Sequence, residues 1–158
     1  MVDSVKPRVA IVDIGIGNLM SIEQAFLHAT CDCIVTRDHK KIMDADAVVL
    51  PGVGAFGDAM KALNKYDLVS PLKEIACSSK YLIGICLGMQ LLFTESNEFG
   101  ASKGLNVIEG EVVKFPRGNT KGILKLAFGT NSSRDKGFRH PDQIGVKLSF
   151  DSFHKLLK

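Results

Sequence analysis

The sequence predicts an α/β fold built on one open, mostly parallel sheet. Short runs rich in β-branched residues alternate with segments that have helical spacing, a pattern that implies right-handed β-α-β units. With 158 residues, 46% of them hydrophobic and 23% charged, the chain is long enough for one domain with a real core. Several of the β-rich runs end in glycine-containing turns, as expected where strands give way to loops.

The elements follow from these patterns in chain order. The first β-rich run ends at Asp13, and after a glycine turn the apolar residues recur at helical spacing. The third run is broken by a Pro-Gly pair, and a helical pattern opens after it. The segment around His39 is polar and is expected to be a loop. Expected strands are 9–13, 33–36, 46–50 and 81–85, expected helices are 21–30, 56–66, 68–77 and a short run at 89–93, and 111–115 alternates like an antiparallel strand.

Three loops lie where a ligand would bind. In an open parallel sheet, ligands sit outside the carboxyl ends of the strands. That rule selects the loops after Asp13, after Leu50 and after Ile85. The loops at 51–57 and at Cys86 follow successive predicted strands, so we expect them to face one site.

Cys86 stands in the most informative motif, Gly84-Ile85-Cys86-Leu87-Gly88. A nucleophile between two glycines at a strand-to-helix turn is the thiol version of the nucleophile elbow. The glycines let neighbouring backbone approach closely, and the free N–H groups of the following helix face any oxyanion formed nearby. The motif therefore predicts covalent catalysis by Cys86. The alternative is a buried cysteine beside two packing glycines.

Composition excludes several other classes. The four cysteines form no Cys-x-x-Cys pair, so a metal or redox site is not expected. The Gly15-x-Gly17 turn lacks the third glycine of a dinucleotide fingerprint, where Met20 stands instead. No targeting signal or membrane span is visible, and a cytoplasmic protein is the default expectation. Residues 1–113 carry a net charge of −4 and residues 114–158 carry +7. That basic tail has no nucleic-acid-reading motif.

Four segments resemble one known family. Residues 13–21, 50–56, 84–90 and 104–112 are similar to class I (triad-type) glutamine amidotransferases, and most closely to the glutaminase subunits of imidazole glycerol phosphate synthases. The resemblance covers residues 8–116. It implies a flavodoxin-like sheet that is incomplete on its C-terminal side. The chain accordingly divides into a glutaminase-like domain, 1–116, and an atypical basic tail, 117–158.

The resemblance also implies roles for individual residues. Cys86 would attack the side-chain amide of glutamine, and the backbone N–H groups of Leu87 and of the Gly52-Val53 segment would hold the oxyanion. Gln90 would help to hold the substrate, and Glu98 would contact its amino group. The alternatives are an ordinary helix residue for Gln90 and a solvated loop charge for Glu98.

The catalytic base is where the chain departs from the family. A thiol nucleophile needs a base, usually a histidine oriented by a carboxylate. The His-x-Glu motif of the family does not occur in these 158 residues. His28 and His39 are not expected near Cys86. His140, which is followed by Pro141 and Asp142, partly matches the motif and is the candidate base, with Asp142 as its carboxylate. The change of charge and the end of the resemblance favour a second hypothesis, that the coding frame changes near residue 120.

The expected function is therefore glutamine hydrolysis, impaired in this chain. The resemblance implies that the ammonia passes to a barrel-type cyclase subunit of imidazole glycerol phosphate synthase in histidine biosynthesis, with no cofactor and no metal. Three alternatives stand beside it: an amidotransferase for the sugars of surface polysaccharides, a non-catalytic remnant that binds a partner, and a flavodoxin-like cofactor binder. The cysteine at the turn argues against the last.

Overall fold

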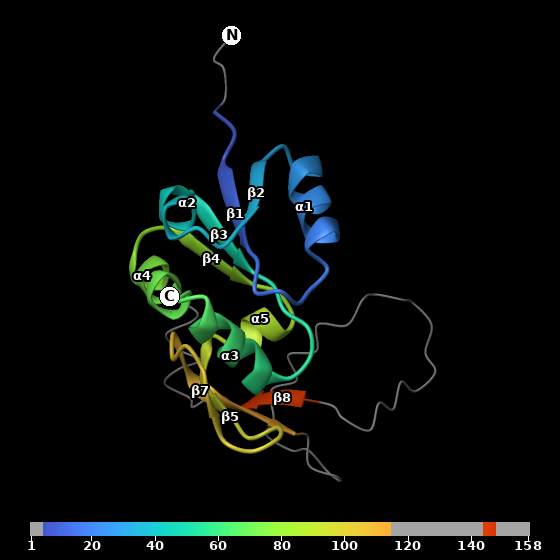
Figure 1. Ribbon diagram of the computed structural model, residues 1–158, viewed down its shortest axis with the longest axis vertical. Coiled ribbons are helices and arrows are strands. Elements are labelled where there is room, and N and C mark those ends of the chain that lie inside the picture. Colours follow the sequence, from blue (N-terminus) through green and yellow to red (C-terminus); the bar gives the residue numbers. More distant parts are fainter. Residues whose placement is uncertain (1–4, 115–143, 148–158) are drawn as a thin grey trace, which may run out of the picture.

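Two four-stranded sheets form the core of the architecture (Figure 1). The computed structural model describes residues 5–114 and 144–147. Sheet A is all parallel, in the order β2-β1-β3-β4, and sheet B is mixed, in the order β6-β5-β7-β8. Sheet A contains β1 (Arg8–Val12), β2 (Asp32–Thr36), β3 (Ala47–Leu50) and β4 (Tyr81–Gly84), and sheet B contains β5 (Phe93–Ser96), β6 (Ser102–Lys103), β7 (Ile108–Lys114) and β8 (Ile144–Lys147).

Five helices connect and cover the strands within the described residues. They are α1 (Leu19–His28), α2 (His39–Asp44), α3 (Phe56–Lys65), α4 (Val69–Cys77) and α5 (Leu87–Gln90). The alternation of strand and helix through sheet A confirms the predicted α/β class and its parallel sheet. The four predicted parallel strands all form, with bounds shifted by one residue at most.

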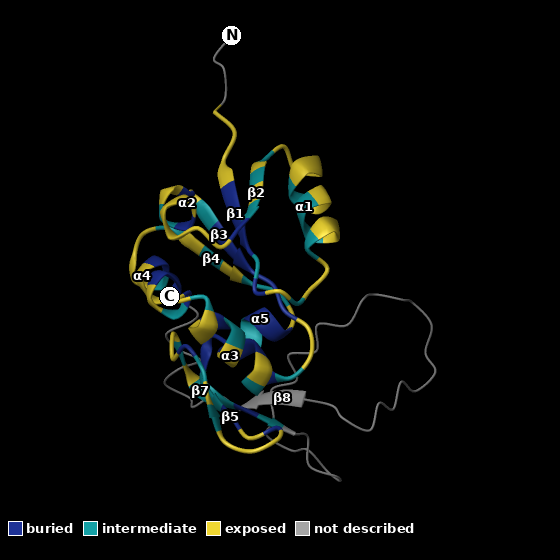
Figure 2. Cartoon of the chain, viewed as in Figure 1, coloured by how far each residue is buried: buried dark blue, intermediate teal, exposed yellow. Residues whose placement is uncertain are grey.

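Helices cover sheet A on both faces, which is why its strands read as continuous apolar runs. On one face, Ala10 and Val12 of β1 pack in the larger core together with residues of α2, α3 and α4. On the other face, Val9 and Ile11 pack against α1, a helix with no fully buried residue. Figure 2 shows β1 and β3 buried in the middle of the sheet and α1 with its outer side exposed.

The α1 face is only partly covered in the described part of the chain. Tyr81 and Ile83 of β4 are in register with Ala47 and Val49 of β3, so they lie on the same face as α1. Their exposed fractions are 75% and 36%. Helix α1 therefore shields the β1–β2 side of this face and leaves β4 open.

The expected polar loop around His39 is wrong, because α2 occupies residues 39–44. The Asp38 side chain accepts a hydrogen bond from the Lys41 backbone N–H at 3.0 Å and caps the helix. Ile42 is the one buried residue of α2. A six-residue helix anchored by one apolar side chain has no detectable period, which explains the error.

Two other expectations need correction near the sequence that follows Cys86. The helix expected at 89–93 is α5, which ends at Gln90, and Phe93 already begins β5. The strand expected at 111–115 is β7, which pairs antiparallel with β8 as predicted but parallel with β5. No described helix is both long and apolar enough to cross a membrane.

Candidate active site

Cys86 sits on a strained turn between β4 and α5. Its backbone has φ 56° and ψ −117°, a conformation that L-residues rarely adopt. Such conformations persist only where the surrounding structure enforces them, and they are concentrated at active sites, where the strain has a function. The Cys86 residue is exposed. This exposure makes the alternative of a buried packing cysteine wrong, and the strained strand-to-helix turn is the backbone geometry of a nucleophile elbow.

The two glycines of the motif are required by close backbone packing. A Cβ added to Gly84 would lie 2.5 Å from the Cα of Met89. At Gly88 it would lie 1.8 Å from the carbonyl oxygen of Leu50. Neither position has room for a side chain, so the turn can form only with glycine on both sides of Cys86.

The loop after β3 lies directly against this turn. Leu50 is in register with Gly84, and the Ile85 N–H donates to the Leu50 carbonyl at 3.0 Å. A Cβ on Gly52 would lie 3.1 Å from the Gly88 nitrogen and 3.2 Å from the Cβ of Leu87. The structure therefore brings the Gly52-Val53 segment beside Leu87, the two places expected to supply oxyanion donors.

Gln90 and Glu98 are both more enclosed than ordinary surface residues. Gln90 ends α5, and its Oε1 atom is buried with no hydrogen-bond partner among the described residues. Glu98 follows β5 and is only 9% exposed, so the alternative of a solvated loop charge is wrong. It helps to line a hollow of about 410 Å³ between the start of α3 and the β5–β6 connection. Cys86 is not among the residues that line this hollow.

No described histidine lies near Cys86. His28 ends α1, four residues before β2 begins at the amino edge of the sheet, and His39 begins α2 three residues after β2 ends. Strands β1 and β3 separate β2 from β4, which is about 14 Å at the usual strand spacing. His140 and Asp142, the base and carboxylate proposed from the sequence, lie outside the described residues.

The other cysteines have different surroundings. Cys31 and Cys33 are partly buried, as expected from the sequence. Burial raises the pKa of the Cys33 thiol, and the nearby Cys31, Glu23 and Asp32 raise it further. Cys33 is therefore poorly suited to act as a thiolate nucleophile. Within the described ranges, no group of three or more His, Cys, Asp or Glu residues could hold a metal ion.

An ion pair at the same edge of the sheet was missed from the sequence. Arg37, just after β2, lies with its Nη2 atom 2.8 Å from Asp13 Oδ2, just after β1. The pair could have been predicted from strand pairing. Strands β1 and β2 are parallel neighbours along their whole length, so the residues that follow them, near 13 and 36, lie side by side.

The chain is similar to known proteins of one family. The family model of class-I glutamine amidotransferases matches residues 10–149, so the match continues past residue 116, where the sequence resemblance had ended. The subunit HisH of imidazole glycerol phosphate synthase from Sulfurimonas denitrificans is 46% identical over 118 residues, which are 75% of this chain and 57% of that protein. The subunit of the same name from Bacillus cereus is 50% identical over 106 residues, which are 67% of this chain and 51% of that protein.

The chain spans little more than half the length of these curated relatives. Among solved structures, the crystal structure of a glutamine amidotransferase aligns with a TM-score of 0.59 at 18% identity, covering 71% of this chain and 59% of the other. That likeness supports the fold. Since the family model matches most of the sequence, the chain belongs to the class-I glutamine amidotransferase family.

Proposed function

We propose that this chain carries the glutamine-hydrolysing site of an amidotransferase, with Cys86 as its nucleophile. The observation that supports this most directly is the strained backbone of Cys86 between two glycines that tolerate no side chain. Strain of this kind persists only where surrounding packing enforces it, and here it presents an exposed thiol at the carboxyl edge of the sheet.

The chemistry follows from the atoms at this edge. The Cys86 Sγ attacks the side-chain carbonyl carbon of glutamine, and the negative charge that develops on the oxygen is held by backbone N–H groups of Leu87 and of the Gly52-Val53 segment. The base takes the proton of the Cys86 thiol during this attack, the carbon–nitrogen bond then breaks, and ammonia leaves with that proton. Water attacks the thioester and releases glutamate and the thiol. Gln90 and Glu98 hold the substrate.

The base comes from outside the described residues. No described histidine reaches Cys86, and in the sequence His140 with Asp142 is the pair that approaches the required arrangement of histidine and carboxylate. We propose, by analogy with the HisH relatives, that a cyclase subunit of imidazole glycerol phosphate synthase receives the ammonia in a cytoplasmic complex. A synthase that amidates the sugars of surface polysaccharides is the alternative recipient.

A second candidate is a module that binds a synthase without hydrolysing glutamine, the alternative expected if no residue of the chain acts as the base. The two differ in one measurement: glutamate release from glutamine by the purified chain, mixed with the cyclase subunit and its nucleotide ligand. The glutaminase proposal expects release that Cys86→Ala lowers by roughly a thousandfold or more. Cys77→Ala is the matched control, because Cys77 is also exposed but ends α4, and it should leave the rate unchanged.

The remaining outcomes separate the candidates. No release from folded wild-type chain would support the binding module and reject the glutaminase. Release that survives in Cys86→Ala would reject Cys86 as the nucleophile. If release requires Cys86, then His140→Ala tests the base, and an unchanged rate would exclude His140.

A further inference from the structure

Arg37 joins three elements at the carboxyl edge of sheet A through one side chain. Its Nε donates to the carbonyl oxygen of Asp13 at 2.7 Å, and its Nη2 lies 2.8 Å from Asp13 Oδ2. Its guanidinium carbon lies 4.1 Å from the ring centroid of Tyr66, the C-cap residue that follows α3. A planar guanidinium can form two hydrogen bonds and stack at once, and a lysine ammonium cannot.

Asp13 extends these contacts into the loop that follows β1. Its second carboxylate oxygen, Oδ1, accepts the Gly15 N–H at 2.8 Å. A Cβ placed on Gly15 would lie 3.6 Å from Arg37 Nη2 and 3.9 Å from the Tyr66 hydroxyl. The backbone of the loop 13–18 therefore lies directly against Arg37 and Tyr66.

The same loop lies beside the segment that precedes the nucleophile turn in space. A Cβ on Gly17 would lie 3.9 Å from the Cβ of Pro51, which is ordinary van der Waals contact. The next residue, Gly52, packs against Leu87 and Gly88. Neighbouring segments thus lead from Arg37 through the loop 13–18 and Pro51 to the backbone around Cys86, with space for little more than a methyl group between Gly17 and Pro51.

We infer that Arg37 is a positioning residue of the candidate active site, which holds the loop 13–18 and through it the Gly52-Val53 backbone against the turn at Cys86. This inference rests on the proposed glutamine hydrolysis. Removing one oxyanion donor lowers the rate of such reactions by about 10²–10³-fold. A donor that is loosened but still present should cost less, about tenfold.

The side chain suits a test by substitution. The Arg37 side chain is 39% exposed, so replacing it removes the contacts without opening a cavity in the core. Arg37→Lys keeps the positive charge but loses the paired hydrogen bonds and the stacking on Tyr66. Arg37→Ala removes the charge, the hydrogen bonds and the stacking. Arg8→Lys is the matched control, since Arg8 also pairs with an aspartate, Asp46, but at the opposite edge of the sheet.

The first measurement compares two reagents for Cys86 in the full 158-residue chain. Iodoacetamide alkylates a thiol without needing an oxyanion donor, whereas a diazoketone analogue of glutamine places its carbonyl where the amide would bind. We expect both Arg37 variants to react about tenfold more slowly with the analogue. Their rates with iodoacetamide should equal the wild-type rate, and Arg8→Lys should match wild type with both. Equal analogue rates for wild type and Arg37→Ala would overturn the inference, and so would equal slowing with both reagents.

Hydrogen exchange tests the inference without glutamine chemistry. Amides in 13–18 and in 51–55 should exchange faster in Arg37→Lys than in wild type or Arg8→Lys, in chains that melt cooperatively. If wild type does not react with the analogue, the proposed function fails, and the exchange of 51–55 then decides the inference alone. Faster exchange there would support positioning by Arg37, and unchanged exchange would overturn it.

Discussion

The two edges of sheet A are built in different ways. At the carboxyl edge, most of the shape comes from the backbone, since Gly15, Gly17, Gly54 and Cys86 all have positive φ, and the Arg37–Asp13 ion pair adds to it. At the amino edge, contacts between charged side chains hold the strand starts together. The Arg8 backbone N–H donates to Asp46 Oδ2 at 2.8 Å, and the Arg8 Nη2 atom lies 3.4 Å from Asp46 Oδ1.

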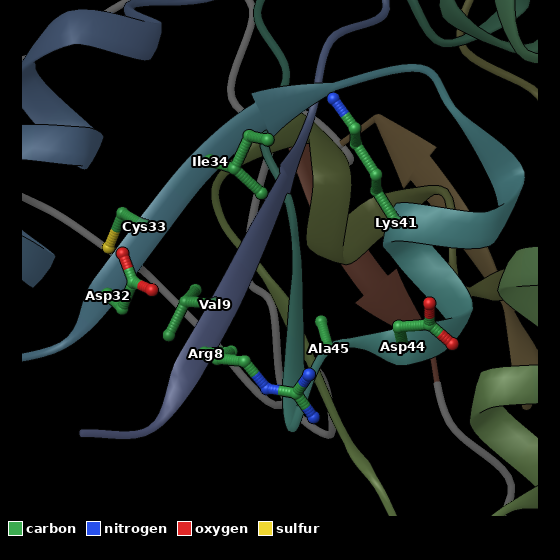
Figure 3. Close-up of a pocket in the computed structure, with 8 residues that line it drawn as sticks. All are labelled: Arg8, Val9, Asp32, Cys33, Ile34, Lys41, Asp44 and Ala45. Atoms are coloured by element: carbon green, nitrogen blue, oxygen red, sulfur yellow. The ribbon is translucent and has the colours of Figure 1, made fainter. Parts of the chain in front are cut away.

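The amino edge also holds a hollow of about 320 Å³ (Figure 3). Its lining mixes apolar strand residues with charges of both signs from the strand starts and from α2: Arg8, Val9, Asp32, Cys33, Ile34, Lys41, Asp44 and Ala45. Flexible charged side chains can rearrange at little cost, whereas a backbone packed on backbone cannot. Substitutions at the carboxyl edge should therefore be far more damaging than those at the amino edge.

The largest expected effect is that of Gly88→Ala. The new Cβ would overlap the Leu50 carbonyl oxygen, and only a shift of β3 or of the Cys86 turn could relieve it. We expect a loss of at least about 3 kcal/mol in the free energy of unfolding, measured in urea. Gly54→Ala is the control, since nothing lies within 4 Å of its added Cβ, and only the strain of φ +94° should cost about 1 kcal/mol. Equal losses for the two variants would show that close packing does not shape this edge.

A smaller effect on the free energy of unfolding is expected at Cys86, where glycine should stabilise the chain relative to alanine. Glycine adopts φ 56° freely, whereas alanine keeps the strain of the native residue. Relief of roughly 1–3 kcal/mol of strain should outweigh the roughly 0.5–1 kcal/mol that glycine loses in backbone entropy. Cys86→Gly should therefore be about 1 kcal/mol more stable than Cys86→Ala in urea unfolding. If Cys86→Gly is the less stable of the two, the turn is not strained.

Much of this edge could be predicted from the sequence, because it depends on glycine. The motif around Cys86 and the Pro-Gly break after Leu50 are visible in the sequence, and their adjacency follows from parallel pairing of β3 and β4. The fold class followed from the alternation of elements. Helix α2 could not be predicted, because one buried residue, Ile42, gives no period.

The contacts that join distant residues follow from strand pairing and not from any local pattern. Arg37 lies 24 positions from Asp13, and nothing in the local pattern of either residue indicates the ion pair. The burial of Glu98 depends on how α3 meets the β5–β6 connection, which no periodicity reports. The base remains a prediction, since His140 and Asp142 lie outside the described residues.

The smallest expected effect concerns the amino edge and appears only in acid. The Arg8 backbone N–H, and then the Arg8 side chain, hold the pKa of Asp46 below its usual value of 3.8. A depressed carboxyl pKa stabilises the folded chain fully above the unfolded pKa, and this contribution is lost as the pH falls through the lower folded value. The difference in unfolding free energy between wild type and Asp46→Asn should therefore be constant from about pH 5 to pH 7 and shrink below about pH 4. Tyr81→Phe, at the same edge, changes no carboxyl group, and its difference from wild type should stay constant across this range. If the difference in unfolding free energy between wild type and Asp46→Asn is equally constant, the contact with Arg8 does not stabilise the charged carboxylate, and this pair does not stabilise the amino edge.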